Sequence, residues 1–186
     1  MKLETHPEVY QPAEDSHLLA DNLDVQKGES VLDVGVGSGI IALTAAEKAL
    51  KVVGVDVNPN AVKLACKNAR INKIHNVEFR QSNLFENVNG KFDLITFNPP
   101  YLPVCEKGVL RDSWSGGVNG LEVVWRFLKD VKKHLKPGGR ILLVVSSLNG
   151  LNNIEGMLAK KGLSFAVKAE CKIPFETLYL VQSKSL

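Results

Sequence analysis

Val31-Leu32-Asp33-Val34-Gly35-Val36-Gly37-Ser38-Gly39 is the stretch of sequence that decides the fold. Its first four residues form an apolar run with one acid, which is typical of a strand. Glycines then occupy every second position, and because glycine tolerates backbone conformations that are closed to other residues, they allow a tight turn. Residues 40–49 follow with a helical pattern. A strand, a glycine-rich turn and a helix in this order predict the start of a β-α-β unit.

Strands and helices continue to alternate along the rest of the chain. One long helix is expected to end at Pro137-Gly138-Gly139, and the last two strands, joined by a short connection with Pro174, should pair as a hairpin. This alternation predicts an α/β fold with a doubly wound, mostly parallel sheet of seven strands and a C-terminal antiparallel hairpin. The expected strands are residues 31–34, 52–55, 77–79, 92–97, 141–145, 163–170 and 177–182, and the expected helices are residues 40–49, 60–71, 120–135 and 151–160.

Composition predicts one globular domain over residues 1–186, with 45% apolar and 23% charged residues. The formal charge of +3 and the pI of about 8.7 come from scattered basic residues, so nucleic acid is permitted as a partner but not required. Three widely spaced cysteines without a CxxC pair, and four histidines without an HExxH pattern, argue against a catalytic metal. No apolar run is long enough for a membrane span, so a cytoplasmic protein is expected.

The glycine-rich turn carries an acid, Asp33, two places before Gly35. A nucleotide-binding turn has the spacing G-x-G-x-x-G and sets a pyrophosphate on a helix N-terminus, whereas the spacing here is G-x-G-x-G. The carboxylate would repel a pyrophosphate and attract an ammonium group. The motif therefore favours S-adenosylmethionine (SAM) over NAD; the simpler alternative is a tight connection between a strand and a helix.

Two later strands end in polar residues that fit the same cofactor. Asp56 ends the second expected strand, where an acid can accept hydrogen bonds from both ribose hydroxyls. Asn83 follows the third strand and is placed to meet the adenine amino group through its side-chain carbonyl, with Leu84 against the ring. The simpler alternative for Asn83 is a polar turn residue.

Asn98-Pro99-Pro100-Tyr101 directly follows the fourth expected strand and is the predicted catalytic motif. Two prolines make the backbone stiff and hold its carbonyl groups in fixed positions. A planar, sp²-bonded nitrogen is a poor nucleophile, so it must be oriented with its N–H groups held by acceptors. Asn98 Oδ1 and the Pro99 carbonyl can supply these acceptors, and the Tyr101 ring can pack against the planar group. Catalysis would then rest on orientation and electrostatic stabilisation.

The order of these motifs resembles the HemK family of class I methyltransferases, over about residues 7–182. Two segments carry the narrower part of the resemblance: Val9-Tyr10-Gln11-Pro12-Ala13-Glu14-Asp15-Ser16, and Ser113-Trp114-Ser115-Gly116-Gly117 with Gly120. HemK proteins methylate the side-chain amide of a glutamine in peptide chain release factors. The resemblance implies the same substrate here, with SAM as the methyl donor and S-adenosylhomocysteine as its product.

The resemblance also implies which residues hold the cofactor, with residues 1–25 lying over it. The implied set is Ser16, Asp33, Gly35, Gly37, Gly39, Asp56, Asn83, Leu84 and Asn98. The chain departs from the family at two positions, where Gln11 and Asn83 replace the usual Glu and Asp. Because an amide at position 83 keeps the carbonyl acceptor but loses the charge, adenine binding is expected to be weaker without being lost.

Bacterial HemK proteins carry an N-terminal helical domain that grips the release factor, whereas only about 25 residues precede the first expected strand here. The chain thus resembles the short archaeal and eukaryotic branch, whose members work with a small zinc-binding activator protein. Residues 77–79 form an edge strand in the expected topology and are a predicted docking surface for such a protein by strand addition. The alternative is an edge that its own charges, Glu78 and Arg80, protect.

Two other functions stay open from the sequence. The NPPY motif is shared with DNA and RNA adenine methyltransferases, so the chain could be a nucleic-acid adenine or guanine N-methyltransferase that flips its target base into the site. The basic pI favours this function slightly, and the lack of a dense basic patch counts against it. A catalytically silent scaffold with the same fold is the third possibility, and the intact Asp33 and Asn98 argue against it.

Overall fold

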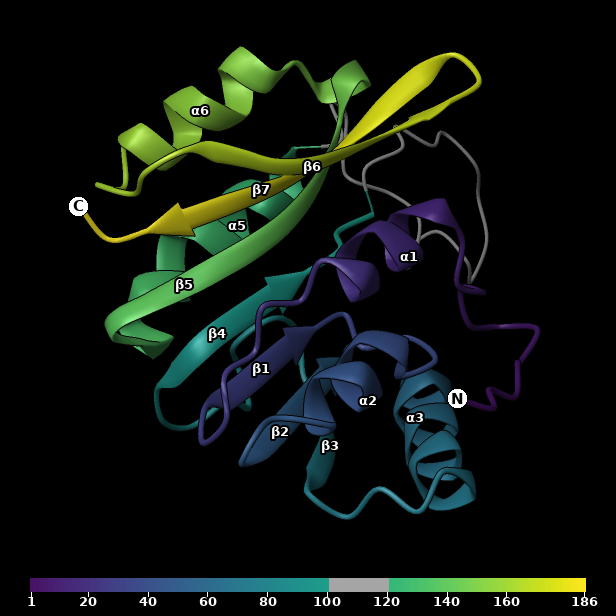
Figure 1. Ribbon diagram of the computed structural model, residues 1–186. Coiled ribbons are helices and arrows are strands. Elements are labelled where there is room, and N and C mark those ends of the chain that lie inside the picture. The colour runs from purple at the N-terminus through teal and green to yellow at the C-terminus, as the bar shows by residue number, and fades with distance from the viewer. Residues whose placement is uncertain (101–120) are drawn as a thin grey trace.

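A computed structural model describes residues 1–100 and 121–186, and a seven-stranded β-sheet lies at its centre (Figure 1). The strand order is β3-β2-β1-β4-β5-β7-β6. Neighbours from β3 to β5 are parallel, and β7 runs antiparallel between β5 and β6. The strands are β1 Ser30–Val34, β2 Lys51–Asp56, β3 Val77–Gln81, β4 Phe92–Phe97, β5 Leu135–Ser146, β6 Ala166–Ile173 and β7 Glu176–Lys184.

Helices cover both faces of the sheet (Figure 1). On β5, Ile141 and Leu143 belong to the apolar cluster that contains α5 and α6, whereas Leu142 belongs to the cluster that contains α1 and α2. Because successive side chains of a strand point to opposite faces, an unbroken apolar strand is buried on both sides. The helices are α1 Glu14–Asp21, α2 Ile40–Ala46, α3 Pro59–Ile71, α5 Glu122–Asp130 and α6 Leu151–Ala159, with short 3₁₀ helices η1 Val131–His134 and η2 Ser147–Asn149.

The predicted architecture is confirmed: the sheet is doubly wound, mostly parallel and closed by an antiparallel hairpin. The helix expected at residues 60–71 is α3, which begins at Pro59 because the Asn58 side chain caps it by accepting a hydrogen bond from the Asn60 N–H at 2.9 Å. The strand expected at residues 163–170 lies further along the chain, since Leu163 makes only an isolated bridge with Ser185 and the paired strand begins at Ala166.

The helix predicted for residues 120–135 is wrong at its C-terminal end. α5 ends at Asp130, η1 tightens the chain to His134, and Leu135 already pairs with Phe92 as the first residue of β5. The segment Pro137-Gly138-Gly139 therefore does not stop a helix but forms an irregularity inside β5, between two registered pairs. Gly138 has a φ of 77°, which glycine adopts without strain. Leu135 fits the helical spacing of the apolar residues, but its backbone pairs with β4.

Two further departures concern the end of α2 and the presence of α1. The helix expected at residues 40–49 ends at Ala46, where the Asn76 side chain donates hydrogen bonds to the carbonyls of Ala46 and Ala49, both at 2.9 Å. These bonds satisfy carbonyl groups that a longer helix would have paired. No helix was predicted at Glu14–Asp21, although α1 begins there with two acids in its first turn, which favour a helix N-terminus.

The sheet brings the expected site residues together at the carboxyl ends of its parallel strands. β1 is central and pairs with β2 on one side and β4 on the other, so the strand order reverses beside it. Ligands of doubly wound folds bind at this switch point, outside the carboxyl ends of the strands. Gly54 lets β2 approach its surroundings closely, since a Cβ there would lie 2.6 Å from the Phe79 ring and 2.8 Å from Val36 Cγ2.

Candidate active site

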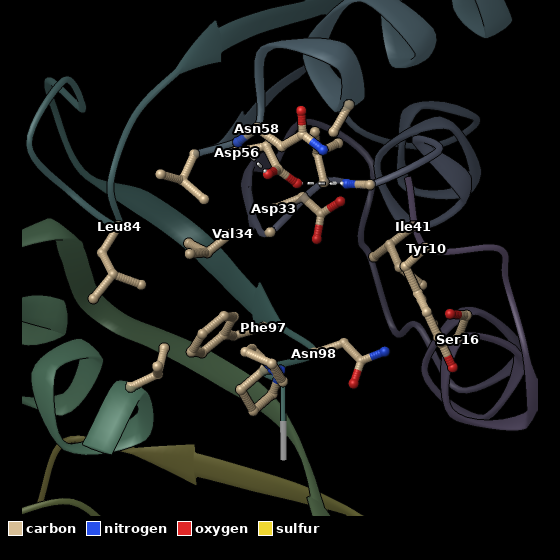
Figure 2. A pocket seen from close by; sticks show the side chains of 18 of the residues that line it. Tyr10, Ser16, Asp33, Val34, Ile41, Asp56, Asn58, Leu84, Phe97 and Asn98 are labelled. Carbon is tan, nitrogen blue, oxygen red and sulfur yellow. Dashed lines mark hydrogen bonds between the residues drawn. The ribbon is translucent and has the colours of Figure 1, made fainter. Parts of the chain in front are cut away.

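A cavity of about 610 Å³ opens at the carboxyl ends of β1, β2 and β4 (Figure 2). Besides the ends of these strands and the residues that follow them, its walls include residues around Tyr10 and Ser16, the first turns of α2 and α3, the loop after β3 and the first turns of α5. Figure 2 shows Asp33, Asp56 and Asn98 reaching the cavity from the ends of three neighbouring strands. The topology thus brings together residues that are up to 65 positions apart in the sequence.

The glycine-rich turn is anchored to β2. The N–H groups of Gly35 and Val36 both donate to the Val55 carbonyl, at 2.8 and 2.9 Å. Gly35 and Gly37 have φ values of 73° and 51° and line the cavity, as predicted residues of the cofactor loop. Gly39, which was also predicted to bind the cofactor, caps α2 with a φ of 90° and is not among the residues that line the cavity.

Asp33 is buried beneath this turn, with 2% of its surface exposed. Its Oδ1 accepts a hydrogen bond from Thr96 Oγ1 at 2.8 Å, whereas Oδ2 accepts none from any residue that the structure describes. Burial raises the pKa of this carboxyl from 3.8 to about 7, the Thr96 hydrogen bond and the Ala42 backbone N–H act in the opposite direction, and the nearby Asp56 raises the pKa further. A buried acid with an unpaired oxygen is suited to receive a cation.

Asp56, at the end of β2, is held by the backbone on both oxygens. Oδ2 accepts from the Gly37 N–H and Oδ1 from the Asn58 N–H, each at 2.9 Å. Burial raises the pKa of Asp56, and these backbone bonds act in the opposite direction. Because a carboxylate offers about four lone-pair sites, it can still accept bonds from a ligand that lies in the cavity.

The loop after β3 forms an apolar end of the cavity. Leu84 and Phe97 line it (Figure 2), and Leu84 has a φ of 51°, a strained value for a residue with a branched side chain. Asn83 also lines this end, where its Oδ1 accepts from Arg126 NH2 at 3.0 Å and its Nδ2 donates to Glu86 Oε1 at 2.9 Å. A donor-only and an acceptor-only partner fix which end of the amide is the oxygen.

Asn98 follows β4, and its side chain points across the cavity toward the wall of Tyr10 and Ser16 (Figure 2). Its Oδ1 is buried and has no hydrogen-bond partner among residues 1–100 and 121–186. Pro99 and Pro100 line the same part of the cavity. Tyr101, the fourth predicted catalytic residue, lies outside the described residues. A buried acceptor without a partner is costly, and such an atom in a cavity indicates a ligand that donates to it.

Ser16 lies on the opposite wall, in the first turns of α1. The Asp15 carboxylate holds it there by accepting from the Ser16 N–H at 2.5 Å and from its Oγ at 3.1 Å. The Tyr10 hydroxyl donates to the same carboxylate, at 3.0 Å to the nearer oxygen. Tyr10, Asn58 and Arg126 also line the cavity, although the sequence assigned them no role. Tyr10 does belong to the segment 9–16 that carries the resemblance to HemK proteins.

The cavity divides into regions that match the parts of SAM. Asp33 and Ser16 would offer polar and ionisable groups to the methionine end, Asp56 would face the ribose, and Leu84 and Phe97 would offer apolar surface to adenine. Oδ2 of Asp33 has no partner among the described residues and could pair with the cationic ammonium of the methionine part. The residues present therefore fit this cofactor.

The described part of the chain supports neither a metal site nor a membrane-spanning helix. There, no group of three or more His, Cys, Asp and Glu side chains could hold a metal ion. None of the helices in the same residues has the length and apolar character that a membrane span requires. Cys66 and Cys171 are free and partly buried.

Comparison with known proteins gives consistent matches. The Methyltransferase small domain family matches residues 1–169. A provisionally named protein N5-glutamine methyltransferase of Methanocaldococcus jannaschii is 46% identical, over 98% of this chain and 95% of that protein. Methyltransferase HEMK2 of Homo sapiens is 34% identical, over 94% and 89% of the two chains. A release factor glutamine methyltransferase of Fusobacterium nucleatum is 47% identical, over 76% of this chain and 48% of its own length.

A solved structure shares the fold. In the E. cuniculi Mtq2–Trm112 complex, described as responsible for methylation of the eRF1 translation termination factor, one chain superposes with a TM-score of 0.75. The match covers 96% of this chain and 99% of that chain, at 24% sequence identity. The likeness at this identity concerns the arrangement of helices and strands.

Proposed function

Since the chain belongs to the Methyltransferase small domain family, it is a methyltransferase, and we propose that it methylates a glutamine side-chain amide of a peptide chain release factor. The resemblance to HemK proteins is confirmed by the HEMK2 and release factor methyltransferase relatives. The names of these relatives supply the substrate class, and the 46% identity over nearly the whole chain supports carrying it over. A substrate in the translation apparatus implies that the reaction takes place in the cytoplasm.

The methyltransferase fold implies the use of SAM, which supplies an electrophilic methyl group when it is bound. In our proposal Asp33 pairs with the methionine ammonium, and Ser16 binds at the same end. The Gly35 and Gly37 turn lets the backbone lie close to the cofactor, while Asp56 accepts from the ribose hydroxyls. Leu84 packs against adenine, and Asn83 presents its Oδ1 to the adenine amino group.

Asn98 holds the acceptor nitrogen. An amide nitrogen has little nucleophilic character because its lone pair is delocalised into the carbonyl. Its N–H groups can be bound by Asn98 Oδ1 and by the Pro99 carbonyl, which aims the nitrogen at the methyl carbon and stabilises the positive charge that develops on it. The nitrogen then loses its proton readily, since methylation makes it acidic. Tyr101 would pack against the planar amide.

The observation that carries this proposal is the buried Oδ1 of Asn98, which has no hydrogen-bond partner among residues 1–100 and 121–186. The atom lies at the carboxyl end of β4, in the cavity that also contains the unpaired Asp33 Oδ2. An acceptor for an N–H group and an acceptor for a cation thus face one space. Asn98 Oδ1 can thus accept from the N–H of a planar substrate, while Asp33 Oδ2 pairs with the ammonium of SAM beside it.

The direct test is the transfer of label from methyl-labelled SAM. The protein, with and without a candidate activator, is incubated in parallel with a release factor, with the same factor carrying Ala in place of its target glutamine, and with mixed RNA and DNA. We expect label in the unmodified release factor alone. Label in nucleic acid but not in protein would support the base-methylating alternative and overturn the proposal.

We further infer that the edge strand β3 docks a small zinc-binding activator. β3 is the terminal strand of the sheet. The Asn76 carbonyl and the Ser82 N–H both bond to β2, so by the alternation of a parallel pair Val77, Phe79 and Gln81 turn their backbone groups away from it. The match to one chain of a two-protein complex supports such a partner. Against it stands the ion pairing of Glu78 with Lys51 and Arg80, which blunts the edge.

Replacing Gln81 by Pro should weaken this docking at least tenfold, because Pro removes an outward backbone N–H from the edge. The measurement is the affinity of each variant for the activator, with SAM binding as a check on folding. Gln81→Ala is the matched control, since it also loses the hydrogen bond from Gln81 Nε2 to the Val57 carbonyl but keeps the N–H. Equal affinity of both variants, or full activity without any partner, would contradict docking at this edge.

A further inference from the structure

Residues 2–9 form an N-terminal strap that contacts α3 and the residues at both of its ends. Figure 1 shows the N-terminus beside α3. Asn68 of α3 and Asn72, which caps the C-terminus of that helix, bind the strap in the same reciprocal way. The Asn72 amide accepts from the Lys2 N–H at 2.9 Å and donates to the Lys2 carbonyl at 2.7 Å. The Asn68 amide accepts from the Glu4 N–H at 2.9 Å and donates to the Glu4 carbonyl at 3.2 Å. Each side-chain amide thus pairs with the strap as a neighbouring strand would.

The strap continues from these pairs to the cavity wall. The Asn58 side chain donates to the Glu8 carbonyl at 2.7 Å, and the Asn58 N–H donates to the ribose-facing Asp56. Val9 is buried against Ala61 and Leu64 of α3. Tyr10, the next residue, lines the cavity. The position of the strap on α3 therefore sets the position of one wall of the cofactor site.

Asn68 differs from Asn72 in one contact. Its Nδ2 also donates to the Ser38 carbonyl, at 2.8 Å. Ser38 belongs to the glycine-rich cofactor turn and lines the cavity. Asn68 is fully buried, at 0% exposed, and one amide thus joins the strap and the cofactor turn. Asn72 instead donates its second bond to the Asn68 carbonyl of its own helix.

We propose that Asn68 is a positioning residue that couples the closure of the N-terminal strap to the conformation of the cofactor turn, and so to SAM binding. The proposal rests on SAM as the occupant of the cavity, which is part of the proposed function. When the strap is paired, the Asn68 amide is oriented to hold Ser38, and the turn is fixed for the cofactor. By thermodynamic reciprocity, the bound cofactor must stabilise the paired strap to the same extent.

The test compares Asn68→Ala with Asn72→Ala, which removes the same side chain and the same kind of strap pairing but no contact to the turn. Because the buried Asn68 side chain loses three hydrogen bonds, one of them to the cofactor turn, we expect the SAM Kd and the KM for SAM of Asn68→Ala to rise about tenfold, with kcat changed less than about twofold. The Kd of Asn72→Ala should stay within about twofold of the wild type. Equal Kd values for the two variants would overturn the proposal.

A measurement on the unmodified protein covers the case in which Asn68→Ala does not fold. Hydrogen exchange of the strap amides, including Glu4 N–H, is followed with and without saturating SAM. We expect SAM to slow exchange in residues 2–9 several-fold, and unchanged exchange would refute the coupling. If the unmodified protein does not bind SAM at all, it is the proposed function that fails; if it binds SAM and the strap does not respond, only the coupling fails.

Discussion

Methyl transfer should be lost when Asn98 is replaced by Ala, while SAM still binds. We expect kcat to fall on the order of 10²–10³-fold, the range seen when one preorganised hydrogen-bonding group is removed from an active site. The SAM Kd should change less than about threefold, because the missing amide faces the substrate side of the cavity. Isothermal titration with SAM gives the Kd, and initial rates on the release factor give kcat.

The matched control is Asn152→Ala, an exposed asparagine on α6 that undergoes the same chemical change. It should behave as the wild type in both measurements. Folding of Asn98→Ala is not expected to suffer, since Oδ1 has no hydrogen-bond partner to lose among the described residues. If Asn98→Ala keeps wild-type kcat, the assigned role is incorrect; if it loses SAM binding instead, Asn98 belongs to the cofactor site.

SAM affinity should depend steeply on pH because of Asp33. The pKa of this carboxyl in the folded protein is raised to about 7, and only the ionised form attracts the methionine ammonium. Below pH 7 we expect the Kd to rise by up to about tenfold per pH unit, because the ionised fraction of Asp33 falls by about that factor for each unit below its pKa. Above about pH 8 the α-amino group of the ligand loses its own proton, so affinity should be greatest near pH 7–8.

The same shift sets the stability of the cofactor-free protein. Because the folded-state pKa of Asp33 lies above its ordinary value of 3.8, the folded protein holds a proton that the unfolded chain has released. The stabilisation from this proton is complete below pH 3.8 and is lost as pH rises to about 7. SAM binding should reverse the trend, since its cation compensates the buried charge.

Asp33→Asn removes the titrating group and should bind SAM on the order of 10–100-fold more weakly at pH 7.5, with a Kd that is flat between pH 5.5 and 7.5. Asp130→Asn is the control, because Asp130 pairs with Lys133 on the surface of α5 and should leave the wild-type profile intact. Titration calorimetry across this pH range decides the matter. A wild-type Kd that does not change between pH 5.5 and 7.5 would mean that Asp33 does not bind the ammonium.

Much of the fold follows from local sequence signals. The unbroken apolar run at Ile141–Val145 indicated a strand buried on both faces, and its alternate residues do contact helices on opposite sides. The motifs after β1, β2 and β4 could be placed together because the carboxyl ends of parallel strands meet at one edge. Ser16, Asp33, Asp56, Leu84 and Asn98 accordingly line one cavity.

Other features depend on contacts that no local pattern encodes. Leu135 fits the helical spacing of α5, but its pairing with Phe92 places it in β5. The end of α2 at Ala46 depends on Asn76, which is 30 positions away in the sequence. Asn68 looks like an ordinary polar residue of a helix, and only the fold shows that it joins the strap to Ser38. Gly39, predicted to bind the cofactor, caps α2 and does not line the cavity, and its cofactor role stays a prediction.

The arrangement around Asn83 has an evolutionary consequence. Asn83 Nδ2 donates to Glu86 Oε1 at 2.9 Å. An Asp at position 83, the residue that HemK proteins usually have, would set two carboxylates against each other there, with Arg126 as their shared cation. Asp at position 83 is therefore less favourable as long as Glu86 is present, and a change of Glu86 alone removes the acceptor of the Asn83 amide. The residue that suits either position thus depends on the residue at the other.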